Sequence, residues 1–160
     1  MSSPDWAAQA LQSFDAVVQA TEGFRSRAGQ RLMAEQVART FSTATLGKVD
    51  EEGGEAAPTR SIAVIQAGTG VGKSLAYCAP AIALALARGT RVLISTATVA
   101  LQEQLVNKDL PALAALMPQP FKFALAKGRG RYVCKLKLDR LAGHGEAEEE
   151  GEDDLFAEEE

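Results

Sequence analysis

The sequence predicts an α/β fold in which a parallel sheet follows two helices. Two short apolar runs, at residues 61–66 and 90–95, are each followed by a segment with the spacing of a helix. This strand–helix–strand–helix order is typical of a parallel sheet, because parallel neighbours must be joined by a crossover connection. Ahead of these runs, residues 4–44 repeat apolar side chains every three or four positions, as amphipathic helices do.

The composition is that of one ordinary globular domain. The chain has 160 residues and is 46% hydrophobic, which is enough for a buried core. No window approaches the roughly eighteen apolar residues of a membrane span, and Asp5 and Asp15 lie where a signal peptide would be basic and then apolar. We therefore expect a soluble cytoplasmic protein with no membrane partner. Cys78, expected in the core, and Cys134 form no CxxC pair, so neither a disulfide framework nor a self-contained zinc site is predicted.

Positive and negative charges are segregated along the chain. The net charge is −4, but ten of the 21 acidic residues lie at 146–160, where there is no base. Residues 1–145 therefore keep 17 basic and 11 acidic residues, a net charge of +6 that could attract a polyanion. Seven bases against one acid make residues 122–140 the densest positive stretch. Charge alone favours the simpler explanation that this stretch is a solvated surface.

Two amphipathic helices are expected at residues 4–20 and 30–44. Their apolar faces hold Trp6, Ala10, Phe14 and Val17 in the first helix and Met33, Val37 and Phe41 in the second. A stretch rich in Gly, Glu and Pro at 47–59 then ends the second helix in an exposed loop. Nothing in that loop suggests chemistry.

The rest of the domain is expected to alternate strands and helices. The elements are a strand at 61–66, a helix at 74–88, a strand at 90–95, a helix at 99–117 and a third strand at 121–126. Gly89 should stop the first of these helices, because glycine readily takes the left-handed conformation that ends a helix. Pro111 should break or kink the second one, because proline lacks a backbone donor.

The segment AGTGVGKS joins the first strand to its helix and has the pattern of a phosphate-binding P-loop. Glycines let successive backbone amides point at the phosphates of a nucleoside triphosphate, and the start of the helix adds its positive dipole end. Lys73 can reach the β- and γ-phosphates, and the hydroxyl of Ser74 can bind the bridging Mg²⁺. Ala67 departs from the plain GxxxxGKS/T form, and a chance glycine-rich turn is the alternative. The residues expected to bind the nucleotide are Ala67, Gly68, Thr69, Gly70, Val71, Gly72, Lys73 and Ser74.

Arg27 and Gln30 lie about forty residues before this loop, at the start of the second expected helix. The amide of Gln30 could pair with the ring nitrogen and the amino group of adenine, so it is a candidate for base recognition. The alternative is that Gln30 is only an early polar position of a surface helix, and spacing alone favours that alternative.

STATVALQEQL, at residues 95–105, follows the second expected strand and opens a helix. The hydroxyls of Ser95, Thr96 and Thr98, together with the free amides of a helix N-terminus, suit a phosphate of a nucleic-acid backbone. Ordinary helix capping by Thr96 or Thr98 is the alternative, and the sequence does not choose between the two.

AKGRGRYVC, at residues 126–134, combines Arg129 and Arg131 with Tyr132. Cations and an aromatic ring can hold phosphates and stack a base. Cys134 by itself is more often a small buried residue than a metal ligand, and one thiolate cannot hold a metal cluster that needs four.

These motifs, in this order, resemble the DinG-type helicases of superfamily two, which are relatives of the XPD helicases. The matching segments are RxxQ at 27–30, QAGTGVGKS at 66–74, STATVALQEQL at 95–105 and GRGRYVC at 128–134. They extend over nearly all of residues 24–140. The resemblance implies a motor of two RecA-like domains that hydrolyses ATP with Mg²⁺ and moves 5′ to 3′ along single-stranded DNA. It further implies the opening of duplexes, forks and R-loops during DNA repair.

The resemblance also implies a role for each matched residue. Arg27 and Gln30 belong to the segment that recognises adenine, with Gln30 as the reader. Cys134 is the first of four ligands to a 4Fe-4S cluster, and the other three lie downstream. The implied DNA contacts are Ser95, Thr96, Thr98, Gln102, Arg129, Arg131 and Tyr132.

The expected domains are an N-terminal helix at 1–23, a partial RecA-like P-loop NTPase domain at 24–126, and the start of an iron–sulfur insert at 127–160. The acidic end of that insert, from residue 145, should be disordered. No DEAH-like Walker B segment and no second motor domain follow within the 160 residues. Phosphoryl transfer needs a group that orients water and cations that meet developing charge. We therefore expect a monomeric N-terminal part of a helicase that does not hydrolyse ATP by itself.

Two other functions stay open. A P-loop kinase or other small-molecule phosphotransferase would need a substrate-binding lid and arginines that close over the phosphates, and the sequence offers neither. A nucleotide-dependent binding module needs only the P-loop, so this function suits the isolated chain.

Overall fold

The computed structural model describes residues 5–23, 25, 27–45, 48–49, 55–56 and 58–143, without the side chains of 48–49, 55–56 and Arg129. The chain divides into two compact units, Met1–Ala124 and Leu125–Glu160. The acidic end that the sequence predicts to be disordered lies outside the described residues. Among the described residues, none of the helices combines the length and the apolar character that a bilayer crossing requires.

Helix α1 (Trp6–Ala20) opens the first unit. The carboxylate of Asp5 accepts a hydrogen bond from the backbone N–H of Ala8 at 3.0 Å. Such a cap satisfies an amide that has no partner inside the helix. The buried side chains of the helix are Ala10, Phe14 and Val17. The apolar face expected from the sequence is therefore confirmed.

Helix α2 (Ala28–Thr43) begins two residues before its expected start and packs against α1. Its buried residues are Gln30, Met33, Ala34, Val37 and Ala38. The guanidinium of Arg31 donates two hydrogen bonds, of 3.2 and 3.1 Å, to the carboxylate of Asp15 in α1. This ion pair lies at the surface, so its contribution to the stability of the fold is small. It links α1 to α2.

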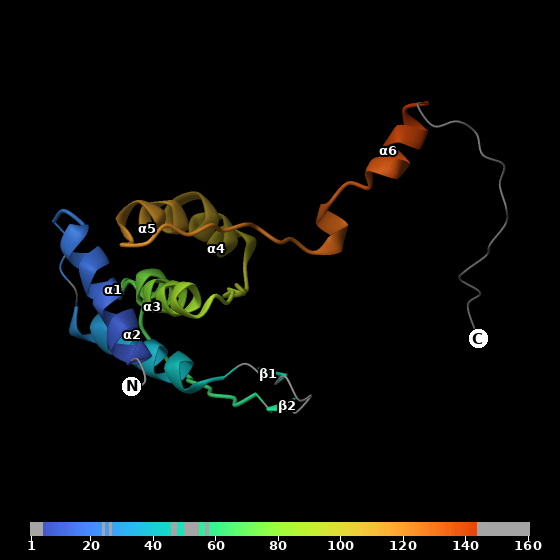
Figure 1. The fold of residues 1–160 in the computed structure, drawn as a ribbon. Coiled ribbons are helices and arrows are strands. Elements are labelled where there is room, and N and C mark those ends of the chain that lie inside the picture. The colour runs from blue at the N-terminus through green and yellow to red at the C-terminus, as the bar shows by residue number, and fades with distance from the viewer. Residues whose placement is uncertain are drawn as a thin grey trace, which may run out of the picture. The chain divides into compact units, whose positions relative to one another are not determined.

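Helix α3 (Lys73–Arg88) lies beside both α1 and α2, as Figure 1 shows, and completes a layer of three helices. It begins after Gly72 and ends at Gly89, and both glycines are in the left-handed conformation. The predicted stop at Gly89 is therefore confirmed. The middle of the helix is buried on nearly all sides, over Ala76, Cys78, Ala79, Pro80, Ala81, Ile82, Ala83 and Leu84.

The helix expected at 99–117 is continuous but irregular. Helix α4 (Val99–Gln104) passes into a π-helical turn (Leu105–Asp109) and then into α5 (Leu110–Leu116). The wide turn lies directly before Pro111, where a normal helical bond to the ring nitrogen is impossible. The predicted kink is thus a local widening of the helix.

The strands expected at 61–66, 90–95 and 121–126 form no sheet within the described residues. They are extended segments, and this expectation of the sequence analysis is not met. Ile65 and Ile94 pack against the helical core, whereas Val64 is 95% exposed and Leu93 is 89% exposed. The physical reason is that a strand forms only when a neighbouring strand accepts and donates its backbone hydrogen bonds. A local apolar pattern indicates burial but does not show whether such a neighbour is present.

The sheet that the described residues do contain is a small hairpin within the loop expected at 47–59. Strand β1 (Lys48–Val49) pairs antiparallel with β2 (Glu55–Ala56), and Figure 1 shows it extending away from the helices. Next to the hairpin, Thr45 and Thr59 form an isolated bridge, reinforced by a 2.7 Å hydrogen bond between their hydroxyls. The described residues of this loop therefore contain a short hairpin that the sequence analysis did not predict.

The second unit has little secondary structure among its described residues. A single 3₁₀ turn (Arg129–Arg131) is followed by the short helix α6 (Lys135–Leu141). The hydroxyl of Tyr132 accepts a hydrogen bond from the backbone N–H of Lys127 at 2.8 Å. The ring therefore closes the loop that carries the glycine-spaced arginines.

Candidate nucleotide-binding site

The P-loop forms the turn that its glycines predict. Gly70 and Gly72 have φ values of +78° and +85°, a region that residues with a Cβ rarely adopt. Gly72 is also the residue from which α3 begins, so the loop ends at the positive end of the helix dipole. The backbone is therefore shaped to present amides and a helix N-terminus to an anion.

Lys73, the first residue of α3, folds back over the loop. Its ammonium donates to the carbonyl of Gly68 at 2.8 Å and to the carbonyl of Ala67 at 3.3 Å. Without a ligand, these carbonyls neutralise part of the charge of the ammonium. A phosphate oxygen carries more negative charge than a carbonyl, so it can replace them as the partner of Lys73.

The N-terminal turn of α2 holds this loop in place. Arg27 donates from Nη1 to the carbonyl of Gly70, and Gln30 donates from Nε2 to the carbonyl of Gly72 at 3.0 Å. These two residues, more than forty positions away in the sequence, thus brace both left-handed glycines. The geometry confirms that RxxQ and the P-loop form one structural unit.

Gln30 is completely buried, with 0% of its surface exposed. The alternative that it is an early polar position on a helix surface is therefore wrong. Its Nε2 must face Gly72, because only a donor can bond to that carbonyl, so its Oε1 points the other way. That Oε1 has no hydrogen-bond partner among the described residues. A buried acceptor without a donor costs roughly 1–3 kcal/mol, so this atom has a hydrogen-bonding capacity that no described residue uses.

A cavity of about 570 Å³ within the first unit connects the P-loop to the STATVALQEQL segment. Its polar lining includes Lys73, Ser74, Ser95 and Thr96, and the rest is largely apolar. Tyr77, which the sequence analysis did not single out, also lines it. Burial raises the pKa of the Tyr77 phenol, against the lowering effect of its hydrogen bond with Ser74. Tyr77 is therefore a neutral neighbour of the residue expected to bind Mg²⁺.

Comparison with known proteins agrees with this geometry. Residues 51–116 match the family model of DEAD/DEAH box helicases. Over 118 residues, or 74% of its length, the chain is 44% identical to the ATP-dependent DNA helicase DinG of Photobacterium profundum. Over 146 residues, or 88%, it is 42% identical to the ATP-dependent helicase DinG of Mycobacterium tuberculosis.

The ATP-dependent DNA helicase DinG of Escherichia coli K12 is 42% identical over 135 residues, or 84% of this chain. The chain carries part of a DEAD/DEAH box helicase domain of the DinG type. It spans 16%, 20% and 17% of the length of these three relatives. The resemblance drawn from the motifs is therefore confirmed for the family.

In this DinG-type chain, the STATVALQEQL segment uses Thr98 as a helix cap. The hydroxyl of Thr98 accepts from the backbone N–H of Leu101 at 3.2 Å, and Thr96 donates to the carbonyl of Thr98 at 3.1 Å. The capping alternative is thus correct for Thr98. Ser95 is exposed and Gln102 is half-buried in α4. A role of these residues in DNA binding stays a prediction.

The second unit of the DinG-type chain places Arg131, Tyr132 and Cys134 at the surface. Cys134 is an exposed free thiol, whereas Cys78 is buried in α3, where desolvation and the nearby Asp109 raise its pKa to about 12. The described residues contain no group of three or more His, Cys, Asp or Glu side chains that could hold a metal ion. One exposed thiolate does not fit a 4Fe-4S cluster, which requires four ligands. The described residues therefore do not form a cluster site by themselves.

Proposed function

We propose that this chain is the ATP-binding part of an ATP-dependent DNA helicase of the DinG type. The observation that carries the proposal is the P-loop braced by Arg27 and Gln30, with the unpaired Oε1 of Gln30 beside it. A P-loop alone occurs in many kinds of nucleotide-binding protein. The additional bracing by an RxxQ segment fits a site that reads the base as well as the phosphates.

In this proposal each residue has one task. The amides of the loop and the ammonium of Lys73 bind the phosphates, and Lys73 exchanges the carbonyls of Ala67 and Gly68 for phosphate oxygens. The unpaired Oε1 of Gln30 accepts from the amino group of adenine. Ser74 provides a hydroxyl ligand for Mg²⁺, which neutralises charge on the bridged phosphates when it is bound.

The DNA-binding part of the proposal concerns two segments. Ser95, Thr96, Thr98 and Gln102 would contact the DNA backbone beside the same cavity that Lys73 lines. Arg129, Arg131 and Tyr132 would engage single-stranded DNA through phosphate contacts and stacking. We infer movement 5′ to 3′ and action by a monomer on forks and R-loops in DNA repair from the family resemblance. Such an enzyme works with the chromosome in the bacterial cytoplasm.

We also propose that the fold becomes a RecA-like α/β domain when the neighbouring strands are present. The segments at 61–66 and 90–95 already expose apolar side chains such as Ile62, Val64 and Leu93, which a sheet would bury. Cys134 would contribute one of the four thiolates of an iron–sulfur insert, with the other three from outside this chain. Among the described residues no Asp or Glu lines the cavity beside Lys73, so the isolated chain should bind ATP without hydrolysing it.

The test uses the full reading frame that contains this chain, purified without oxygen. We expect ATP hydrolysis that single-stranded DNA stimulates and that Lys73→Ala abolishes, together with bound iron and sulfide in equal amounts. Lys108→Ala is the matched control, because Lys108 is an exposed lysine of the π-helical turn outside the site. Hydrolysis that is independent of DNA would instead favour a phosphotransferase or a simple binding module.

A further inference from the structure

Helices α2 and α3 are joined by polar contacts at both ends. At their N-terminal ends, Gln30 of α2 bonds to Gly72, from which α3 begins. At their C-terminal ends, Arg88 of α3 bonds to the last turn of α2. The two helices therefore run in the same direction, with one contact at the nucleotide site and the other about 16 Å along α2, at 1.5 Å per residue.

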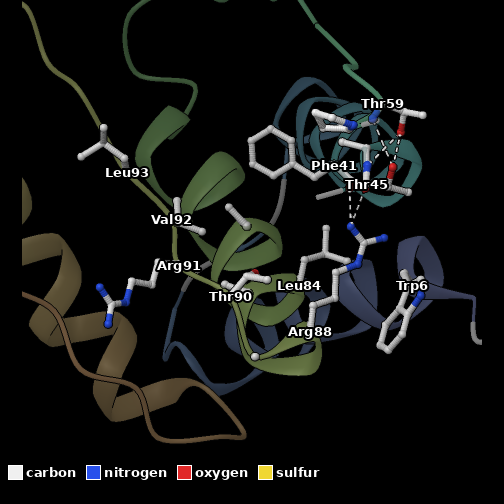
Figure 2. Close-up of a pocket in the computed structure, with 15 residues that line it drawn as sticks. Trp6, Phe41, Thr45, Thr59, Leu84, Arg88, Thr90, Arg91, Val92 and Leu93 are labelled. Carbon is white, nitrogen blue, oxygen red and sulfur yellow. Dashed lines mark hydrogen bonds between the residues drawn. The ribbon is translucent and has the colours of Figure 1, made fainter. Parts of the chain in front are cut away.

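Arg88 makes three hydrogen bonds to α2. Its guanidinium donates from Nη1 to the carbonyls of Phe41 and Ala44, at 2.9 and 3.0 Å, and from Nη2 to the carbonyl of Ser42 at 2.6 Å. Figure 2 shows Arg88 reaching from α3 to this helix end. These carbonyls have no partner inside the helix, and they lie at the negative end of its dipole. Because α2 has no basic residue in its own last turn, Arg88 acts as its C-terminal cap.

Trp6 fixes the guanidinium from the other side. The Cζ of Arg88 lies 5.6 Å from the centroid of the Trp6 ring, within the range of a cation–π contact. Trp6 is the first residue of α1, and α1 packs against both other helices. One side chain of α3 is thus in contact with both other helices of the layer.

The packing between α2 and α3 depends largely on small side chains. Alanines are prominent in this buried core, where α2 contributes Ala34 and Ala38 and α3 contributes Ala76, Ala79 and Ala83. Small side chains form shallow ridges, so they resist axial sliding less than large interlocking ones. The directional hydrogen bonds at the two ends therefore contribute to the register of the two helices in addition to the packing.

We propose that Arg88 is a positioning residue of the nucleotide site, which acts through α2 on Gln30. The inference rests on the proposed recognition of adenine by Gln30. The bond from Gln30 to Gly72 measures 3.0 Å, and a hydrogen bond weakens as its length and angle depart from the ideal, so a displacement of α2 relative to α3 would weaken it. Arg88 prevents that shift by anchoring the far end of the same helix.

The test compares two ligands of the full-length protein that contains this chain. Inorganic tripolyphosphate probes the P-loop alone, and ATP probes the P-loop together with the base site. We expect Arg88→Met to weaken ATP binding about tenfold, equivalent to ~1.4 kcal/mol. Tripolyphosphate binding should weaken by a clearly smaller factor, because this ligand loses only the bracing of the P-loop by Gln30 and not a contact to the base. Arg88→Lys should restore part of the loss, because an ammonium can still donate to one or two of the carbonyls.

Arg91→Met is the matched control. Arg91 lines the same pocket as Arg88 and is exposed, but it donates none of the three bonds to α2, and Figure 2 shows it directed away from that helix. Its removal should leave both affinities unchanged. Equal weakening of ATP and tripolyphosphate by Arg88→Met, or an effect of the same size from Arg91→Met, would show a general structural role and overturn the inference.

A Gln30→Ala variant separates this inference from the proposed function. If Gln30→Ala leaves ATP affinity unchanged, adenine recognition by Gln30 is wrong, and the inference is overturned with it. If Gln30→Ala weakens ATP binding and Arg88→Met does not, the proposed function holds and only the role of Arg88 is refuted. Combining both substitutions should cost no more than Gln30→Ala alone, because both remove the same contact.

Discussion

Replacing Gly72 by alanine tests the contact between α2 and the P-loop directly. Gly72 has a φ of +85°, where an added Cβ costs roughly 1–2 kcal/mol in any residue other than glycine. In addition, that Cβ would overlap the Nε2 of Gln30, which now donates to the Gly72 carbonyl. The Nε2 of Gln30 must therefore shift away, which breaks this bond and adds about 0.5–1.5 kcal/mol.

We therefore expect Gly72→Ala to lower the free energy of unfolding by roughly 1.5–3.5 kcal/mol in total. Urea denaturation of the chain, followed by circular dichroism, measures this change as a lower midpoint with an unchanged slope. Affinity for ATP should fall in parallel, because the shape of the loop and the position of Gln30 change together.

Gly89→Ala is a control with the same backbone conformation. Gly89 has a φ of +62° at the other end of α3, and an added Cβ there would meet nothing within 4 Å. It should therefore cost only the conformational part, about 1–2 kcal/mol. Placing Gly72→Ala in a Gln30→Ala background should reduce its effect to the same value. If Gly72→Ala and Gly89→Ala are equally destabilising in the natural chain, Gln30 does not lie against the P-loop and our account of the site is refuted.

Two further predictions concern single side chains. Burial raises the pKa of Cys78 to about 12, so Cys78 should remain a thiol at pH 8. Iodoacetamide should therefore label the exposed Cys134 and leave Cys78 unmodified until the chain is unfolded. Mass spectrometry of the peptides measures the labelling, and equal labelling of both cysteines would contradict this prediction. Thr98→Ala should lower the stability of the α4 segment by about 1 kcal/mol, because the helix loses its N-terminal cap. Thr98→Ser should keep the cap and the stability. Amide hydrogen exchange in α4 measures the difference between the two variants.

Sequence reasoning located the helices and the P-loop because both are local patterns. The spacing of Phe14 and Val17 defines one face of a helix, and the glycines of the P-loop determine a turn within eight residues. Contacts between distant positions gave no such signal. The burial of Gln30 depends on Gly72, which is 42 positions away, and Arg88 bonds to carbonyls between 44 and 47 positions away. Backbone carbonyls are present at every residue, so no sequence pattern distinguishes the ones that Arg88 binds.

The predicted strands do not form a sheet within the described residues, and the reason is again that pairing depends on distant positions. An apolar run predicts that a segment will be buried, but it contains no information about which other strand covers it. Ile65 and Ile94 are packed against the helices, while Val64 and Leu93 are left exposed. Among the described residues, the side chains that bond to the P-loop nevertheless belong to the helices: Arg27 and Gln30 at the start of α2 and Lys73 at the start of α3. The three-helix layer therefore positions these side chains at the P-loop although the segments at 61–66 and 90–95 form no sheet within the described residues.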